Sequence, residues 1–271
     1  MSLRTVARVA AAVFRESVRD RVLYSIVAFA ALVTGASLLI SQLTAGQDVK
    51  IIKDLGLAAM SLFGAFIAIF IGIGLVAKEV EKKSVYSLLA KPVRRSELVI
   101  GKYAGLVLTL AINLAVMTLV WYGVLAYYAF TAEELVRKSW EAPALDPRML
   151  QAVYLIFVQL MLVTAIAVFF STFSTSSMLS ALFTIGFFIA GQFSADLRNF
   201  ESVVSSPVVA LITRALYYVL PNMAAFDLKA AVVHGRPVAG LELAAATGYG
   251  LPYVAALLLA SIVIFTRRDF K

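Results

Sequence analysis

Few residues of this 271-residue sequence have the type and spacing that chemistry requires. The one histidine, His234, belongs to no cluster of carboxylates, and the sequence has no cysteine, so it indicates neither a metal site nor a thiol nucleophile. The sequence also lacks the G-x-x-x-x-G-K-[ST] loop that binds ATP phosphates, and the H-E-x-x-H and G-x-S-x-G motifs of hydrolases. We therefore expect a protein that is not an enzyme and that binds no cofactor of its own.

Three polar side chains interrupt long apolar segments: Asn113, Gln159 and Gln192. They could line a path for a substrate, or they could make hydrogen bonds between packed helices, which is the commoner use. The apolar segments contain essentially no ionisable residue. Because a carrier driven by protons or sodium ions needs acidic side chains at mid-membrane, the sequence disfavours that class.

The composition indicates that these polar residues lie on membrane-spanning helices. Hydrophobic residues make up 62% of the sequence and charged residues 15%, whereas a soluble globular protein has about 25% charged residues. Together with a mean hydropathy of +0.91, these values predict an all-α polytopic membrane protein. The net charge of +8 lies mostly in blocks beside apolar segments, which indicates a fixed orientation in the membrane and not binding to nucleic acid.

Six apolar runs are long enough to cross a bilayer as helices: residues 22–43, 56–77, 104–130, 149–170, 178–194 and 243–265. Residues 203–220 are also apolar but contain Pro207 and Arg214. With six spans, fifteen of the 24 Lys and Arg residues fall on the side that the positive-inside rule assigns to the cytoplasm; a seventh span would move the basic C-terminus outside. We therefore expect one domain, residues 1–271, with both termini in the cytoplasm and a re-entrant or interfacial external region over residues 195–242.

Residues 1–20 predict an interfacial helix and not a span. Four arginines cluster on one side of a helical wheel: Arg4, Arg8, Arg15 and Arg19. Small apolar side chains lie roughly opposite: Val6, Val9, Ala10 and Val13. A helix of this kind lies in the headgroup region with its basic side toward anionic lipids.

The segment over residues 78–103 is the most polar long stretch of the sequence, and it separates two spans. It carries seven Lys and Arg residues against three glutamates, which places it in the cytoplasm. Within it lies a short apolar patch, Val85, Tyr86, Leu88 and Leu89. Either this patch docks on a partner protein, or it folds back on the interfacial helix and the ends of the spans. The spacing Gly101-x-x-x-Gly105 at the end of the segment suits a close contact between helices.

Four stretches resemble the membrane permeases of type-2 ATP-binding-cassette transporters, the ABC-2 family. They are residues 14–21 (FRESVRDR), residues 79–103 with LLAKPVRR at 88–95 and Gly101-Lys102-Tyr103, residues 220–229 (LPNMAAFDLK) and residues 265–270 (FTRRDF). The branch that they resemble most is the permease that serves maturation of nitrous-oxide reductase.

The resemblance implies a fold, partners and site residues. It implies a homodimer of six-span subunits in the inner membrane of a prokaryote, bound to two copies of a separate ATPase that holds ATP and magnesium. Residues 1–20 would be an elbow helix, marked by Arg15, Glu16, Arg19 and Arg21, and residues 78–103 would be a cytoplasmic coupling loop. Its short helix would contact the ATPase through Glu79, Glu81, Tyr86, Leu88, Leu89 and Lys91. Residues 171–177 would make a second, smaller contact, and the external region would gate the exit.

Two functions follow from this reading. The chain is expected to be the permease subunit of an exporter, with Asn113, Gln159 and Gln192 as candidates for the translocation path. The alternative is a membrane subunit that transports nothing and passes ATPase strokes to a periplasmic partner protein. The same cytoplasmic loop would serve both, and the sequence does not identify a cargo.

Overall fold

All regular secondary structure in the computed structural model is helical over the residues that it describes, 2–19, 22–43, 48–81, 94–174, 176–194 and 207–267. The elements are α1 (Leu3–Arg19), α2 (Val22–Leu43), α3 (Asp48–Glu81), α5 (Arg95–Thr131), α6 (Glu134–Ser139), α7 (Met149–Phe173), α8 (Ser177–Gln192), α10 (Pro207–Val219), the 3₁₀ helix η1 (Met223–Phe226), α11 (Lys229–Val233) and α12 (Gly240–Arg267). No strand occurs in these ranges, and the predicted all-α class is confirmed.

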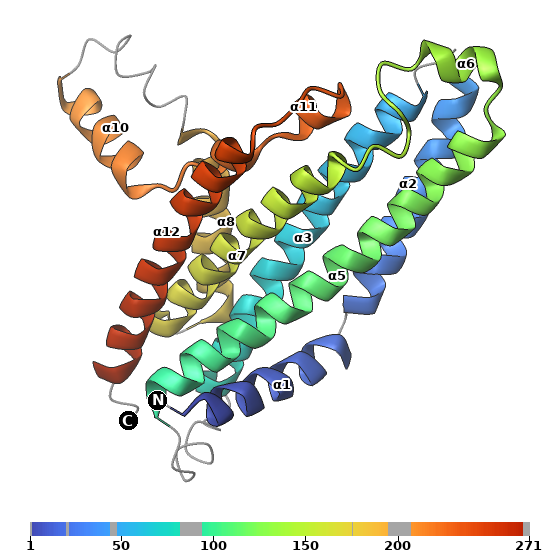
Figure 1. Cartoon of the computed structure of the whole chain (residues 1–271). Coiled ribbons are helices and arrows are strands. Elements are labelled where there is room, and N and C mark those ends of the chain that lie inside the picture. The colour runs from blue at the N-terminus through green and yellow to red at the C-terminus, as the bar shows by residue number, and fades with distance from the viewer. Residues whose placement is uncertain are drawn as a thin grey trace.

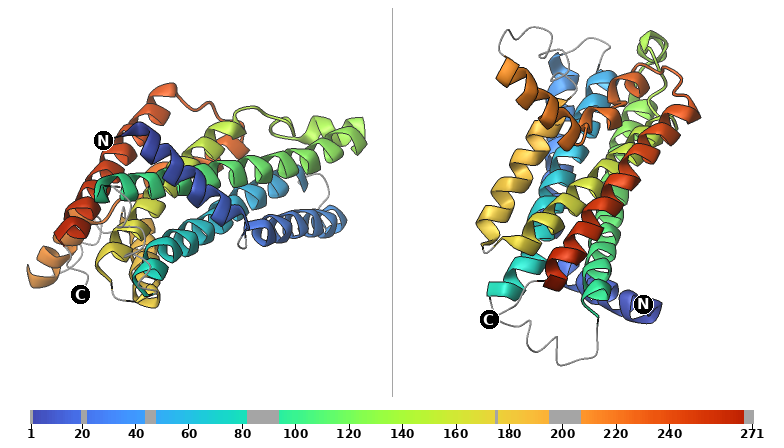
Figure 2. Two further views of the ribbon diagram at one scale, coloured as in Figure 1. Left: turned by 90° about the horizontal axis from the view of Figure 1, so that it is seen from below. Right: turned by 90° about the vertical axis from the view of Figure 1, so that its left-hand side faces the viewer.

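The long helices run side by side in one bundle, and the short ones cover its two ends (Figure 1). Helix α1 lies across the bundle at the end where α5 begins and α12 finishes, and α6, α10 and α11 lie at the opposite end (Figures 1 and 2). We call these the inner end and the outer end. The described segments that the sequence predicts for the cytoplasmic side and those that it predicts for the outer side thus lie at opposite ends of the bundle.

Four helices are long and apolar enough to cross a bilayer: Asp48–Ile73, Arg95–Thr131, Met149–Phe173 and Gly240–Arg267. They correspond to the second, third, fourth and sixth predicted spans. Two shorter apolar helices, Ile26–Leu39 and Ser177–Gln192, correspond to the first and the fifth. The number of six spans therefore stays a prediction, of which four are supported by length and composition.

Two helices begin earlier than the sequence predicts. Helix α3 begins at Asp48 and not near residue 56, and α5 begins at Arg95 and not near residue 104. Polar residues are tolerated in a helix where it extends beyond the hydrocarbon layer, so their appearance marks the edge of the membrane and not the end of the helix. Residues 78–81 and 95–103 of the predicted loop are thus helical, and residues 82–93 lie outside the described part of the chain.

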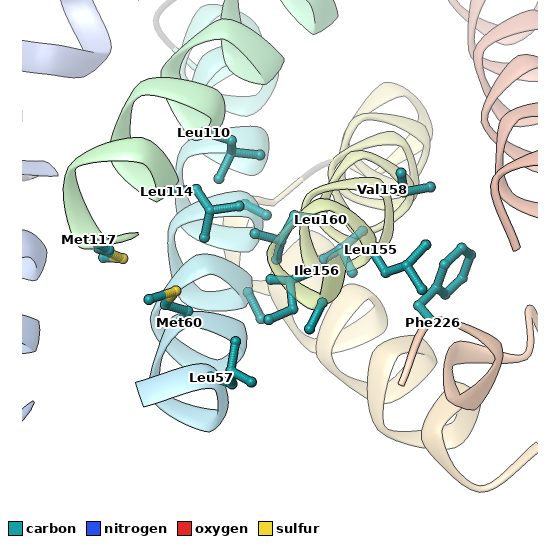
Figure 3. Close-up of a cluster of buried hydrophobic side chains, with 14 of the residues drawn as sticks. Leu57, Met60, Leu110, Leu114, Met117, Leu155, Ile156, Val158, Leu160 and Phe226 are labelled. Atoms are coloured by element: carbon teal, nitrogen blue, oxygen red, sulfur yellow. The ribbon is translucent and has the colours of Figure 1, made fainter. Parts of the chain in front are cut away.

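The core lies where α7 packs between its neighbours. In α7, 72% of the apolar span is buried, against 22% in α12, which places α7 at the centre of the bundle and α12 at its edge. Figure 3 shows leucine, isoleucine and methionine side chains from α3, α5 and α7 that meet in this core, among them Leu57, Met60, Leu110, Leu114, Met117, Leu155, Ile156 and Leu160. The fifth predicted span returns beside the fourth: the Ser180 hydroxyl of α8 donates to the carbonyl oxygen of Phe170 of α7 at 3.5 Å.

Candidate functional site

Helix α1 packs directly on the first turns of α5 (Figure 2, left). A Cβ atom at Gly101 would lie 2.7 Å from the Cβ of Val9, and one at Gly105 would lie 2.7 Å from the carbonyl oxygen of Ala10. Only glycine allows the two backbones to approach so closely. The helix contact predicted from the spacing Gly101-x-x-x-Gly105 is confirmed.

The apolar side of α1 faces the bundle. Val13 is buried in a small cluster with Val99 and Leu106 of α5 and Phe265 of α12. Arg15 and Glu16 of the predicted elbow residues are exposed, as are Arg4 and Arg8. Arg19 is the last residue of α1, and its side chain lies outside the description, as does the whole of Arg21. The exposed arginines leave a basic surface at the inner end.

We expect the change Gly105→Leu to displace α1 from α5. The new side chain would meet the backbone of Ala10, which cannot move aside as a flexible side chain can, at an overpacking cost of about 1–3 kcal/mol. The measurement is the rate at which trypsin cleaves after Arg8 and Arg15 in the detergent-solubilised chain, which should rise several-fold. Gly123→Leu is the matched control on the same helix, because a Cβ there meets nothing within 4 Å. Equal cleavage rates in both variants would contradict the contact.

The first turn of α5 is fixed to two other elements. Glu97 is 4% exposed, and its carboxylate accepts hydrogen bonds from the backbone N–H groups of Ser2 and Arg94. The Nη1 atom of Arg95 donates to the carbonyl oxygens of Phe265 at 3.1 Å and of Thr266 at 2.8 Å, in the last turn of α12. A carboxylate at a helix start and a guanidinium at a helix end both oppose the local helix dipole favourably. The start of α1, the start of α5 and the end of α12 therefore meet in one junction.

The predicted ATPase contacts precede this junction in the sequence. Glu79 and Glu81 are in the last turn of α3, where the structure describes the backbone and not the side chains. Tyr86, Leu88, Leu89 and Lys91 fall within residues 82–93, outside the described ranges. Their role stays a prediction.

The three candidates for a translocation path lie on different helices. Asn113 of α5 is buried; its Nδ2 donates to the carbonyl oxygen of Thr109 at 2.7 Å, and its Oδ1 has no hydrogen-bond partner among the residues that the structure describes. Gln159 of α7 is buried and accepts from the Ser61 hydroxyl of α3 at 3.5 Å, which is the helix-packing use that the sequence favours. Gln192 is the last residue of α8. No hydrogen bond found within the described ranges joins these three side chains.

A buried lysine at the outer end was missed by the sequence reasoning, which placed it in a loop. Lys53 of α3 is 1% exposed, and its Nζ donates to the carbonyl oxygens of Ala142 at 3.3 Å and of Pro143 at 2.7 Å. The sequence does contain a pattern that could have shown this. Apolar or small residues that are buried in α3 form a helical stripe with steps of three and four residues, and position 53 falls within it: Val49, Ile52, Gly56, Leu57 and Met60. Lys53 belongs to that stripe and anchors α3 to the segment between α6 and α7.

Comparison with known protein families gives a match over almost the whole chain. The model of the ABC-2 family transporter protein matches residues 7–270, which include α1 from its fifth residue on and every apolar helix described above. A comparison with curated proteins finds no match. The family match agrees with the resemblance seen in the sequence, and the apolar helices agree with a multi-pass membrane protein. The chain belongs to the ABC-2 family of transporter proteins, and it is a membrane permease of that family.

Proposed function

We propose that this chain is the permease subunit of an exporter, which couples ATP hydrolysis by a separate ATPase subunit to the movement of a substrate across the membrane. The observation that carries the proposal is the family match over residues 7–270, because ABC-2 permeases associate with an ABC ATPase and generally lack an ATPase site. The sequence agrees with this division of labour, since it contains no phosphate-binding loop.

In the proposed assembly, two copies of the chain form a homodimer in the inner membrane with two ATPase subunits. Closed twofold symmetry is the common way for half a transporter to obtain its other half. The inner end faces the cytoplasm. Two observations support this orientation: the excess of Lys and Arg in the segments predicted for that side, and the position of α1 and the end of α12 at the same end of the bundle (Figure 1).

We expect the conformational change of the ATPase to be transmitted to the helix bundle at the junction at the start of α5. The ATPase would grip the coupling loop through Glu79, Glu81, Tyr86, Leu88, Leu89 and Lys91. A displacement of the loop would reach α5 at Arg94, and the bonds of Arg95 and Glu97 would pass it to α12 and α1. Asn113, Gln159 and Gln192 remain the candidates for the path, and the unpaired Oδ1 of Asn113 is available to a polar substrate group.

The test is a double change in the coupling loop, Tyr86→Asp with Leu89→Asp. Burying these side chains in a cleft of the ATPase would contribute roughly 1.5–3 kcal/mol each, so two carboxylates there should release the ATPase. The chain is isolated from its own cells in mild detergent, and the ATPase is identified by mass spectrometry through its phosphate-binding loop. We expect the double variant to lose it.

Leu135→Asp is the matched control for this experiment. Leu135 is 79% exposed on α6, at the outer end, so the same kind of change there should leave the ATPase bound. If the double variant retains its ATPase at the level of the unmodified protein, residues 82–93 are not the coupling element. If the unmodified chain brings down no ABC ATPase, the proposed function is wrong.

A further inference from the structure

The turn after α11 is fastened to two other segments at the outer end of the bundle. The Nδ1 atom of His234 lies 2.7 Å from Oε2 of Glu141, in the segment between α6 and α7. The other oxygen of the same carboxylate, Oε1, accepts from the Nζ atom of Lys50 in the first turn of α3, at 3.3 Å. We call Lys50, Glu141 and His234 the outer clasp, because one carboxylate joins three parts of the chain.

Backbone contacts seat the turn beside the clasp. The Nη1 atom of Arg148 donates to the carbonyl oxygen of Gly235 at 2.8 Å. Gly235 has φ +66°, a conformation that favours glycine, and a Cβ there would lie 2.9 Å from the Cβ of Ala142. On the other side, Val232 and Val233 of α11 are buried in the core. The position of His234 is therefore set by packing as well as by its own hydrogen bond.

Charged groups from each neighbouring segment surround His234. Helix α3 contributes Lys50, the buried Lys53 and Asp54, which is near enough to attract a charged imidazole. The segment between α6 and α7 contributes Glu141, Asp146 and Arg148, and Arg236 follows in the turn itself. The His234 side chain is 37% exposed and that of Glu141 53%, so protons reach both from solvent.

We propose that the outer clasp is sensitive to pH and that it holds the α11 turn more firmly when His234 takes up a proton. A neutral imidazole keeps only a hydrogen bond to Glu141. A protonated one forms a charge-assisted bond with the same oxygen, which is roughly twice as strong, and it is also attracted by Asp54. Among unperturbed side chains, histidine alone changes its charge between about pH 5 and 8.

The carboxylate sets the acid limit of this behaviour. The hydrogen bond with His234 in the first place, and then the one with Lys50, lower the pKa of Glu141 below its ordinary value. Glu141 therefore stays ionised at acid pH, and its contribution is lost only as the pH falls through that lowered pKa. The charged pair is therefore lost on the acid side only as the pH falls through the lowered pKa of Glu141.

The outer clasp bears on the position of α12, because α11 precedes α12 in the chain. Residues 236–239 connect the clasped turn to the first residue of α12, so the turn fixes where that helix begins at the outer end. In the proposed orientation this end faces outward, and acid surroundings would hold the turn before α12 in place, while neutral ones would loosen it. This last step rests on the proposed function, whereas the pH response of the clasp does not.

Hydrogen exchange of the purified full-length chain in nanodiscs tests the proposal. The amides of Gly235 and Arg236 donate to the carbonyl oxygens of Val232 at 3.1 Å and of Ala231 at 2.9 Å, so their exchange reports opening of the turn. After correction for the intrinsic pH dependence of exchange, we expect about two- to five-fold stronger protection near pH 5.5 than near pH 7.5, as suits a solvent-exposed ion pair.

Two variants and one control decide the outcome. His234→Gln keeps a polar side chain that cannot be charged, and it should abolish the difference between the two pH values. Glu141→Gln keeps an acceptor without charge, and it should reduce the difference, because Asp54 still attracts a charged imidazole. Glu134→Gln is the control, because Glu134 pairs with Lys138 within α6 and should leave the difference intact. Equal protection at both pH values in the unmodified chain, or an unchanged difference in His234→Gln, would overturn the proposal. Neither result depends on an ATPase, so failure here is separate from failure of the proposed function.

Discussion

A change of Gly56 to alanine is expected to force α3 and α5 apart. A Cβ atom at Gly56 would lie 2.0 Å from Nε1 and 2.3 Å from Cδ1 of Trp121, closer than any real contact. The indole is fully buried and donates to the carbonyl oxygen of Ile52 at 3.1 Å, so the ring cannot turn away without breaking that bond. Overpacking and the lost hydrogen bond together should lower the free energy of unfolding by about 2–4 kcal/mol.

Tryptophan fluorescence during thermal unfolding in detergent measures this effect. The chain has two tryptophans, Trp121 and Trp140, so the signal is simple to assign. Gly123→Ala on α5 is the matched control, because nothing lies within 4 Å of the added methyl group and alanine favours the helix by up to about 1 kcal/mol. A Gly56→Ala protein that melts at the temperature of the unmodified chain would show that α3 and α5 are not packed through Trp121.

The change Lys53→Met is expected to have an effect of similar size for a different reason. Methionine fills much of the space of the lysine side chain, but it donates no hydrogen bond, so the buried bond to the carbonyl oxygen of Ala142 and the part-buried bond to that of Pro143 are both lost. An unsatisfied buried acceptor such as the Ala142 carbonyl costs about 1–3 kcal/mol, and the loss of the Pro143 bond adds to this cost. Removal of a buried charge offsets only part of the sum. The unfolding free energy should fall by about 2–4 kcal/mol.

Lys50→Met provides the comparison, since it is the same change one turn away. The Lys50 side chain is 31% exposed and its partner Glu141 is solvated, so the loss there should stay below about 1 kcal/mol. Both variants can be unfolded in the same detergent with increasing amounts of a denaturing one. Equal stability of the two would mean that Lys53 does not anchor α3 to the segment before α7.

Local patterns in the sequence are enough to predict the parts of the fold that depend on single helices. Apolar runs predict six spans, of which the four long ones are supported by length and composition, and the spacing of Gly101 and Gly105 predicts a close helix contact, which the structure shows to be with α1. The starts of α3 and α5 could not be read in the same way, because charged residues such as Asp54 fit a helix that projects from the membrane.

Contacts between distant segments leave no local pattern at all. Arg95 binds carbonyl oxygens 170 and 171 residues further along the chain, and backbone acceptors of this kind have no characteristic side chain. His234 and Glu141 are 93 residues apart, and each looks isolated in the sequence. These pairs become visible only when the helices that carry them are placed in space.

The length of α5 allows a small movement at its inner end to produce a large one at its outer end. It runs without proline for 37 residues, from the junction with α1 and α12 to the outer end, which at 1.5 Å per residue is about 55 Å. A rigid rod of that length converts a tilt of about 5° at its inner end into a shift of about 5 Å at its outer end. Helix α12, tied to it by Arg95, carries Pro252, a residue at which helices kink. In the proposed assembly, a displacement at the inner end would be transmitted along α5 to the outer end of the bundle. In α12 a bend at Pro252 would take up part of the same displacement, so the outer ends of the two helices would separate.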